Sequence, residues 1–295
     1  MFLKEDKDLL QDSRRESDEA TQNFMDDINA ALFALLADPT DANIKKFRDT
    51  RDALLVGWLA AISGQSQKRF YEAAQIGIDA ADDQLKKKNI DKIIKETITK
   101  KTYTDKIESS LYSLTTDLTA ITESIKSNSE KIIKEIKNQS IEGTIGEQKK
   151  ISTSLAADLQ ERGITFFTDK IGRKIPIEKY IAMRVQTDTA NMQRSSFFLR
   201  AIQYDVDLVR IIHLNIHPSC ELCRPFENKI LSINGRTPGY MTIDNAMLNG
   251  LFHPNCDHVP EELELAPEDK GGEGLIDLNE QNKKRFEYSK KQSVI

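Results

Sequence analysis

The chain has 295 residues, of which 39% are hydrophobic and 30% charged, and its 42 basic and 47 acidic side chains give a net charge of -5. A chain of this length can bury one large core or two smaller ones, so we expect one or two domains. The negative charge excludes a protein that binds nucleic acid through an overall positive charge.

Three cysteines are an odd number, and two of them form a Cys-x-x-Cys, so the sequence does not predict a secreted disulfide framework. The N-terminus lacks the basic-then-apolar layout of a signal peptide, and the longest nearly apolar run, 53–62, is too short to cross a bilayer. We therefore expect a protein that is made in the cytoplasm and has no membrane segment.

The first half of the chain predicts helix almost throughout. Apolar residues recur at steps of three and four from Phe24 to Leu35, and the sequence 38–41, Asp-Pro-Thr-Asp, breaks this pattern and offers new N-cap side chains. A second helix follows, with Gly64 as its expected end, and a third is expected over about 67–88.

Lysines gather where this third helix ends. Phosphate contact is one interpretation of such a cluster, and a solvated helix face is the alternative. The candidate nucleic-acid contacts are Lys86, Lys87, Lys88 and Lys92.

A heptad stripe lies between residues 107 and 132, with apolar residues at alternating steps of four and three. Asn128 is the only polar residue on it. Such a stripe is typical of a helix that pairs with another copy of the chain or packs inside its own bundle, and both interpretations stand. The members of the stripe are Ile107, Leu111, Leu114, Leu118, Ile121, Ile125 and Ile132.

The second half has a different character. Two short strands over 164–167 and 174–175 are expected around a turn at Gly172, and Pro176 is expected to open a helix. A buried strand over 207–213, a hairpin arm over 229–233 that turns at Asn234-Gly235, and a short helix over 242–248 should follow.

The predicted fold is therefore α+β and predominantly α. A long helical N-terminal half, either a bundle or a coiled-coil-like arm, precedes a small α+β module that contains cysteine and histidine. The expected domains are a helical assembly arm at 1–145, a hinge or linker helix at 146–162, the module at 163–265 and a flexible charged tail at 266–295.

Every cysteine and histidine of the chain lies between residues 213 and 258. The first elbow, residues 217–223, reads His-Pro-Ser-Cys-Glu-Leu-Cys, and the second elbow, residues 253–258, reads His-Pro-Asn-Cys-Asp-His. A spacer of 29 residues separates them, which is the spacing of a tetrahedral zinc site. The seven residues are His213, His217, Cys220, Cys223, His253, Cys256 and His258.

Four ligands would complete a closed zinc shell. We expect Cys220, Cys223 and Cys256 with one of His253 or His258. A shell without an open position is structural rather than catalytic, and it could contribute on the order of 10 kcal/mol to folding. His217 is an alternative ligand or a hydrogen-bond partner of a ligand, and His213, on the expected strand, is interpreted as an ordinary histidine.

An enzyme is the alternative interpretation of the same residues. The sequence has no His-x-Glu, which a zinc deaminase needs. A metal-dependent nuclease, or a toxin-like effector carried on a helical stalk, could use Asp257-His258 or the run 253–255. No separate acid/base pair appears, so we assign no catalytic residue.

Several segments of the second half resemble the bacteriophage minor capsid protein 2 family, which is related to the Mu F-like head morphogenesis proteins. The resemblance covers about residues 163–260, and Gly-Leu-Phe-His-Pro-Asn-Cys at 250–256 is its most specific part. Two residues depart from the family pattern, namely Asp257 in place of a basic residue and Asn228 in place of glycine. Asparagine tolerates the left-handed conformation that glycine would adopt. The other matching segments are 167–173, the helix with Tyr180 and Arg184, and 217–229.

The resemblance implies a structural minor capsid protein of a tailed phage, located in the virion at the portal vertex. Its implied partners are the portal protein, the major capsid protein, or both, together with packaged DNA. Some relatives leave the capsid with the genome, and the resemblance leaves open whether this chain is ejected as well.

Overall fold

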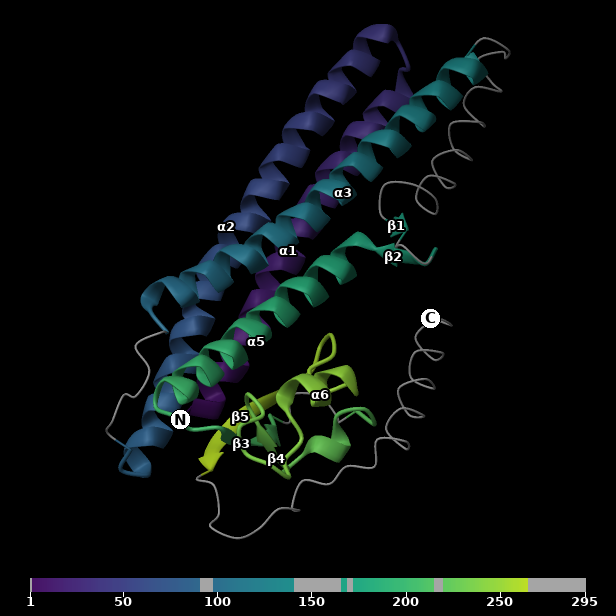
Figure 1. The fold of residues 1–295 in the computed structure, drawn as a ribbon. Coiled ribbons are helices and arrows are strands. Elements are labelled where there is room, and N and C mark those ends of the chain that lie inside the picture. Colours follow the sequence, from purple (N-terminus) through teal and green to yellow (C-terminus); the bar gives the residue numbers. More distant parts are fainter. Residues whose placement is uncertain (1, 91–97, 141–165, 169–171, 215–219, 265–295) are drawn as a thin grey trace. The chain divides into compact units, whose positions relative to one another are not determined.

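A computed structural model describes residues 2–90, 98–140, 166–168, 172–214 and 220–264. Four long helices dominate this part of the chain, and a small sheet region follows them in sequence (Figure 1). The predicted fold class, mostly helical with a small α+β part, is confirmed. The long helices are α1 (Phe2–Ala37), α2 (Asp41–Lys87), α3 (Lys100–Ser140) and α5 (Ile177–Gln203).

The expected break between the first two helices is confirmed, and the expected end at Gly64 is wrong. The Asn43 backbone N–H donates to Thr40 Oγ1 at 3.3 Å, so Thr40 caps the start of α2. The helix then continues through Gly64 to Lys87. A glycine inside a helix costs about 1 kcal/mol, which the buried apolar residues on both sides of Gly64 outweigh.

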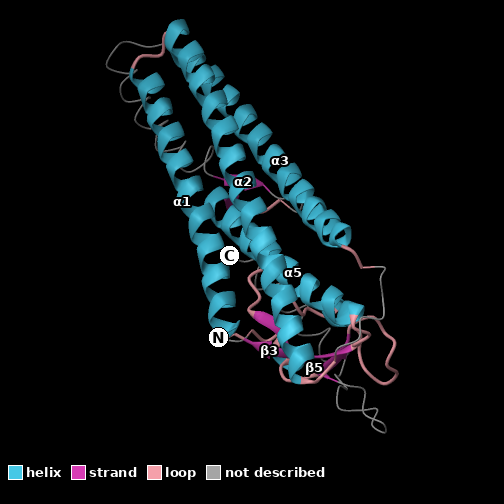
Figure 2. Ribbon diagram, turned by 90° about the vertical axis from the view of Figure 1, so that its left-hand side faces the viewer, coloured by secondary structure: helices cyan, strands magenta, loops and turns pink. Residues whose placement is uncertain are grey.

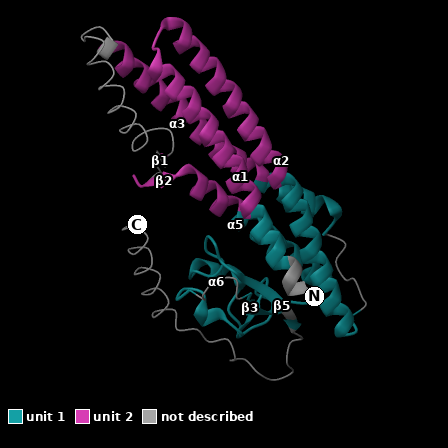
Figure 3. Ribbon diagram, turned by 180° about the vertical axis from the view of Figure 1, so that it is seen from behind, with its two compact units in different colours: residues 1–13, 67–110, 186–295 teal, residues 14–66, 111–185 magenta. Residues whose placement is uncertain are grey.

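Contacts divide the chain into two compact units (Figure 3). Unit 1 contains residues 1–13, 67–110 and 186–295, and unit 2 contains residues 14–66 and 111–185. Each long helix therefore contributes a segment to both units. The division into arm, linker, module and tail stays a prediction, and residues 146–162 and 266–295 lie outside the described part of the chain.

Unit 2 contains a short hairpin besides its helical segments. Strands β1 (Phe166–Thr168) and β2 (Lys174–Pro176) pair antiparallel, with Phe167 opposite Ile175. Gly172 adopts a φ of 85°, which glycine tolerates without strain. Helix α5 begins directly after Pro176, so the predicted hairpin and helix start are confirmed.

The heptad stripe is buried within the single chain. Six of its seven members are at most 4% exposed, and Leu111 is half-buried. Packing inside the chain's own helices is therefore the arrangement observed for these six residues, and self-association through the stripe stays a prediction. Ser129, with no exposed surface, is the buried polar residue, whereas Asn128 is half-buried. The Ser129 hydroxyl donates to the carbonyl of Ile125 at 2.7 Å, which makes its burial tolerable.

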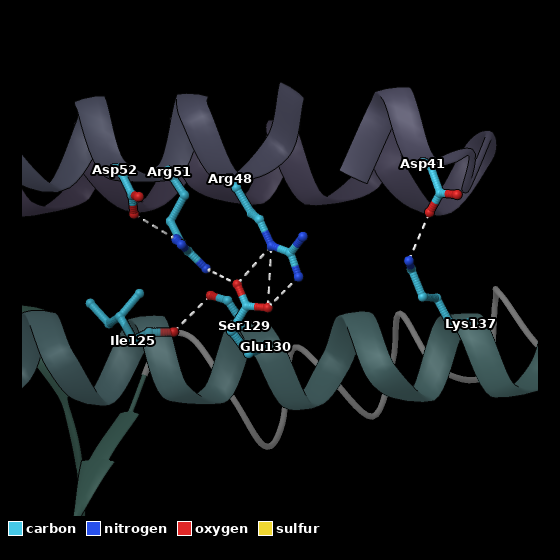
Figure 4. Close-up of polar contacts among 8 residues, drawn as sticks. All are labelled: Asp41, Arg48, Arg51, Asp52, Ile125, Ser129, Glu130 and Lys137. Atoms are coloured by element: carbon cyan, nitrogen blue, oxygen red, sulfur yellow. Dashed lines mark hydrogen bonds and ion pairs between the residues drawn. The ribbon is translucent and has the colours of Figure 1, made fainter. Parts of the chain in front are cut away.

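Charged side chains connect α2 to α3 in unit 2 (Figure 4). Glu130 accepts hydrogen bonds from Arg48 Nη2 at 2.6 Å and from Arg51 Nη1 at 2.8 Å. The bond from Arg48, with help from Arg51, lowers the pKa of Glu130 to about 2. Further along, Lys137 pairs with Asp41 at 2.7 Å.

Unit 1 contains a three-stranded antiparallel sheet in which β3 lies between β4 and β5. Strands β3 and β5 are labelled in Figure 2. Strand β3 (Leu208–His213) confirms the predicted buried strand, whereas β5 (His258–Glu264) was not predicted. Strand β4 (Ile230–Ser232) pairs with β3, and not in a hairpin through Asn234-Gly235 as expected. After that turn the chain forms a parallel bridge between Ser232 and Thr242, and it enters α6 (Ile243–Leu248).

This topology brings the two elbows together. The first elbow follows the end of β3, and β5 begins opposite that end, because His258 pairs with His213. Both elbows therefore adjoin the same end of the central strand.

Candidate metal centre

The described part of the first elbow is a tight turn that presents two thiols. The backbone N–H of Arg224 donates to the carbonyl of Cys220 at 3.0 Å, and the N–H of Cys223 points at Cys220 Sγ at 3.4 Å. The 3-10 helix η1 (Arg224–Phe226) follows, and the fully buried Phe226 anchors it. Asn228 has a φ of 59°, so the asparagine adopts the expected left-handed conformation.

The second elbow follows α6 and is also built from tight turns. Thr242 caps α6, and Gly250, with a φ of 106°, takes the chain away from its end. The side chain of Leu222 lies 3.4 Å from where a Cβ on Gly250 would stand. The N–H of Cys256 then donates to the carbonyl of His253 at 3.0 Å, which closes the elbow.

The structure brings the five predicted ligands into one cluster. Cys220, Cys223 and His253 form one group, and Cys223, Cys256 and His258 form another; within each group the ligand atoms lie within 4.8 Å of one another. Cys223 belongs to both groups. It is buried, as is Cys256, and their sulfur atoms are 3.5 Å apart.

Both histidines are oriented as metal ligands usually are. His253 places Nε2 2.8 Å from Cys220 Sγ and Nδ1 2.7 Å from the carbonyl of Pro254. His258 places Nδ1 3.4 Å from Cys256 Sγ and Nε2 3.0 Å from Glu227 Oε1. In each ring one nitrogen therefore donates to an oxygen, and the other nitrogen faces a cysteine sulfur.

The thiols differ in how readily they ionise. The hydrogen bond with Cys223, and the contact with His253, lower the pKa of Cys220 to about 4. Burial raises the pKa of Cys256, but its hydrogen bonds with Cys223 and His258 and the charge of Arg194 outweigh burial and place it well below its ordinary value. The same contacts with Cys220 and Cys256, together with burial, raise the pKa of Cys223.

The neighbouring cysteines raise the pKa values of both histidines. Burial lowers the pKa of His258, but Cys256 and Glu227 outweigh this effect and raise it overall. Burial lowers the pKa of His253 as well, but Cys220, the charge of Cys256 and the hydrogen bond to Pro254 together outweigh it and raise the pKa overall. The cluster thus has cysteine sulfur and imidazole groups in close contact, and this Cys3His-type set can hold a metal ion.

The other predicted site residues lie apart from this cluster. His217 and Lys92 lie outside the described residues, and contact of the lysines with nucleic acid stays a prediction. Lys86 and Lys87 are exposed at the end of α2. His213 has its ring 4.8 Å from that of His258 but belongs to neither group of ligands.

Sequence reasoning missed two residues of the site. Glu227 holds His258, and Arg194 of α5 donates to the carbonyls of Cys256 and His258. Glu227 lies in the segment 217–229 that carried the resemblance, but nothing in its spacing indicated its partner. Arg194 is 62 residues from Cys256 along the chain, so no local pattern could connect them.

A family model described as phage minor capsid protein 2 matches residues 25–295, which is most of the chain. The chain belongs to the phage minor capsid protein 2 family. The match includes most of the helical N-terminal half of this minor capsid protein, so the resemblance seen over 163–260 was too short. No curated protein and no solved structure matches the chain.

Membership of this family implies a location in the virion and partners among virion proteins. Among the described residues, no helix of this minor capsid protein is long and apolar enough to span a bilayer.

Proposed function

We propose that this minor capsid protein is a structural component of the phage head at the portal vertex. The portal protein, the major capsid protein, or both are its neighbours, and it leaves the head with the packaged DNA. Family membership supports a virion role, and the long helices supply extended surfaces on which virion proteins can assemble.

The metal centre, on this proposal, is a structural zinc site. The observation that carries the proposal is the cluster of three cysteine thiols with two imidazoles that are already oriented by oxygen acceptors. Thiolate and imidazole ligands suit zinc, and Cys220, Cys223 and Cys256 with one histidine would leave no position open for a substrate. The ion would hold together the loop between β3 and β4 and the loop between α6 and β5.

Copurification tests the partner and the location together. A tagged chain expressed with the portal protein of its phage should elute with it in a stable complex, and the chain should be present in purified heads. Particles that have released their DNA should lack it. Elution apart from both the portal and the major capsid protein would contradict the proposed location.

A cleavage assay tests the structural interpretation against a nuclease. We expect no cutting of DNA or RNA in magnesium, manganese or zinc, because His258, the histidine paired with a carboxylate, is only 2% exposed and can reach no substrate. Cleavage that is lost in His258→Ala, in a variant that still contains zinc, would overturn the structural role.

A further inference from the structure

We propose that Arg194 is a positioning residue for the metal centre: its guanidinium holds the backbone of the second elbow in the conformation that brings the candidate ligands Cys256 and His258 to the ion. This inference rests on the proposed zinc site and assigns a role to a residue outside the ligand set.

The hydrogen bonds of Arg194 carry the first step. Its Nε donates to the carbonyl of His258 at 2.8 Å, and its Nη2 donates to the carbonyl of Cys256 at 2.5 Å. The two carbonyls flank Asp257, so one planar group fixes the backbone on both sides of that residue. Arginine suits this task because its N–H donors form a rigid fork.

A ring contact extends the same restraint to the start of the second elbow. The guanidinium carbon of Arg194 lies 4.4 Å from the ring centre of Phe252. Phe252 has a φ of 60° and directly precedes His253. One side chain therefore contacts the residue before one candidate ligand and the backbone of two others.

The position of Arg194 is itself fixed. Its Nη1 donates to Asn191 Oδ1 at 3.0 Å, one turn earlier in α5, and the residue is only 2% exposed. A side chain held in this way can act as a template, because the loop must adapt to it rather than the reverse.

The charge of Arg194 matches what the centre requires. A buried cation is costly unless charges of opposite sign lie near it. Cys256, Cys223 and Asp257 are the groups whose charges favour the guanidinium here, against the effect of burial, which lowers its pKa. A zinc ion with three thiolates keeps one net negative charge, which a buried arginine beside it balances.

A measurement of metal affinity distinguishes a positioning role of Arg194 from a general contribution to the stability of the protein. We would measure competition of zinc with a chromophoric chelator, and the absorption spectrum of the cobalt-substituted full-length chain, for Arg194→Met and Arg194→Lys. Arg200→Met is the matched control: Arg200 is also in α5, pairs with Asp82 at 2.6 Å, and contacts neither elbow in the interactions the structure shows.

We expect Arg194→Met to bind zinc about 10- to 100-fold more weakly and to shift the cobalt spectrum, because residues that orient ligands have effects of this size. Arg194→Lys keeps the positive charge but loses the forked N–H donors of the guanidinium. Its zinc affinity should therefore lie between those of Arg194→Met and the wild type. Arg200→Met should lose stability but keep the affinity and the spectrum.

Two results would overturn the inference. One is Arg194→Met with the zinc affinity and cobalt spectrum of Arg200→Met. The other, decisive if Arg194→Met does not fold, is Arg194→Lys with wild-type affinity and spectrum. A wild-type chain that binds no metal would instead reject the proposed zinc site, so the two failures are distinguishable.

Discussion

Cys223 is the central residue of the candidate metal centre, since it belongs to both groups of candidate ligands. We predict that Cys223→Ser abolishes tight metal binding, because a serine hydroxyl is a far poorer zinc ligand than a thiolate, and that it lowers the free energy of unfolding by several kcal/mol. Elemental analysis and denaturant unfolding of the same sample measure both effects.

His213→Gln is the control for this variant. The ring of His213 lies 4.8 Å from that of His258, but the residue is outside both groups, so the variant should keep its metal. Full metal content in Cys223→Ser, or loss of metal in His213→Gln, would show that the ligand set is wrong.

Glu130 makes the stability of the protein depend on pH. Its pKa is lowered from 4.5 to about 2, chiefly by Arg48, so the charged form contributes stability above about pH 4.5, and the contribution is lost as the pH falls toward 2. The side chain is 44% exposed, so solvent screening limits the contribution to about 1 kcal/mol.

Glu130→Gln should therefore be less stable than the wild type near neutral pH, and the difference should vanish near pH 2. Urea unfolding at several pH values measures this. Asp49→Asn removes the exposed pair of Asp49 with Lys45 and should have a smaller effect. A difference between Glu130→Gln and wild type that does not change with pH would refute the account of this pair.

Helices α2 and α5 approach each other closely at Gly77. A Cβ at this position would lie 2.2 Å from the carbonyl oxygen of Gln193 and 3.0 Å from the backbone N of Phe197. Backbone atoms cannot move aside cheaply, so we predict that Gly77→Ala lowers the free energy of unfolding by about 3 kcal/mol. Thermal and denaturant unfolding measure the change.

Gly64→Ala is the matched control in the same helix. A Cβ there meets nothing within 4 Å, so alanine should stabilise α2 by about 1 kcal/mol through its better helix propensity. Equal effects of the two substitutions would mean that the close approach at Gly77 is not as described.

The helices show which elements the sequence could and could not predict. The start of α2 and the ends of α6 follow from local chemistry, namely Thr40, Thr242 and Gly250, and they were predicted near their observed positions. The predicted helix end at Gly64 was wrong, because packing along the whole of α2 outweighs the cost of one glycine inside the helix. Strand β5 was missed because its pairing with β3 is set by residues about 50 positions away.

The candidate site likewise contains some residues that the sequence could predict and others that it could not. The five candidate ligands could be predicted because every cysteine and histidine of the chain lies between residues 213 and 258. Their partners could not, because Glu227 and Arg194 are ordinary charged residues until the fold brings them to His258. The choice between His253 and His258 stays open, since both have the same kind of orienting contact.

The three-stranded sheet and the two elbows share their buried core with the long helices. In unit 1, one buried cluster joins Ala81 and Leu85 of α2 and Phe197 of α5 to Val209 and Leu231 of the sheet. A second, smaller cluster joins Leu10, Ala190, Leu214 and Val259. The sheet and its elbows therefore depend on helical residues far away in sequence for their apolar packing.

We predict that a fragment of residues 163–265 does not unfold cooperatively even with zinc, because it lacks the α2 residues of this core. Calorimetry and amide NMR spectra of the fragment, beside the full chain, measure this. Leu85→Ala in the full chain should destabilise the protein by about 2–4 kcal/mol, since Leu85 is 2% exposed. A cooperatively folded fragment would show that the module is autonomous.

The metal content of the purified full-length chain tests the central claim most directly. The account predicts about one tightly bound zinc ion per chain, and a lower and broader thermal transition after a strong chelator removes it. A chain that contains no transition metal, cannot be loaded with zinc, and melts identically with and without the chelator would contradict it.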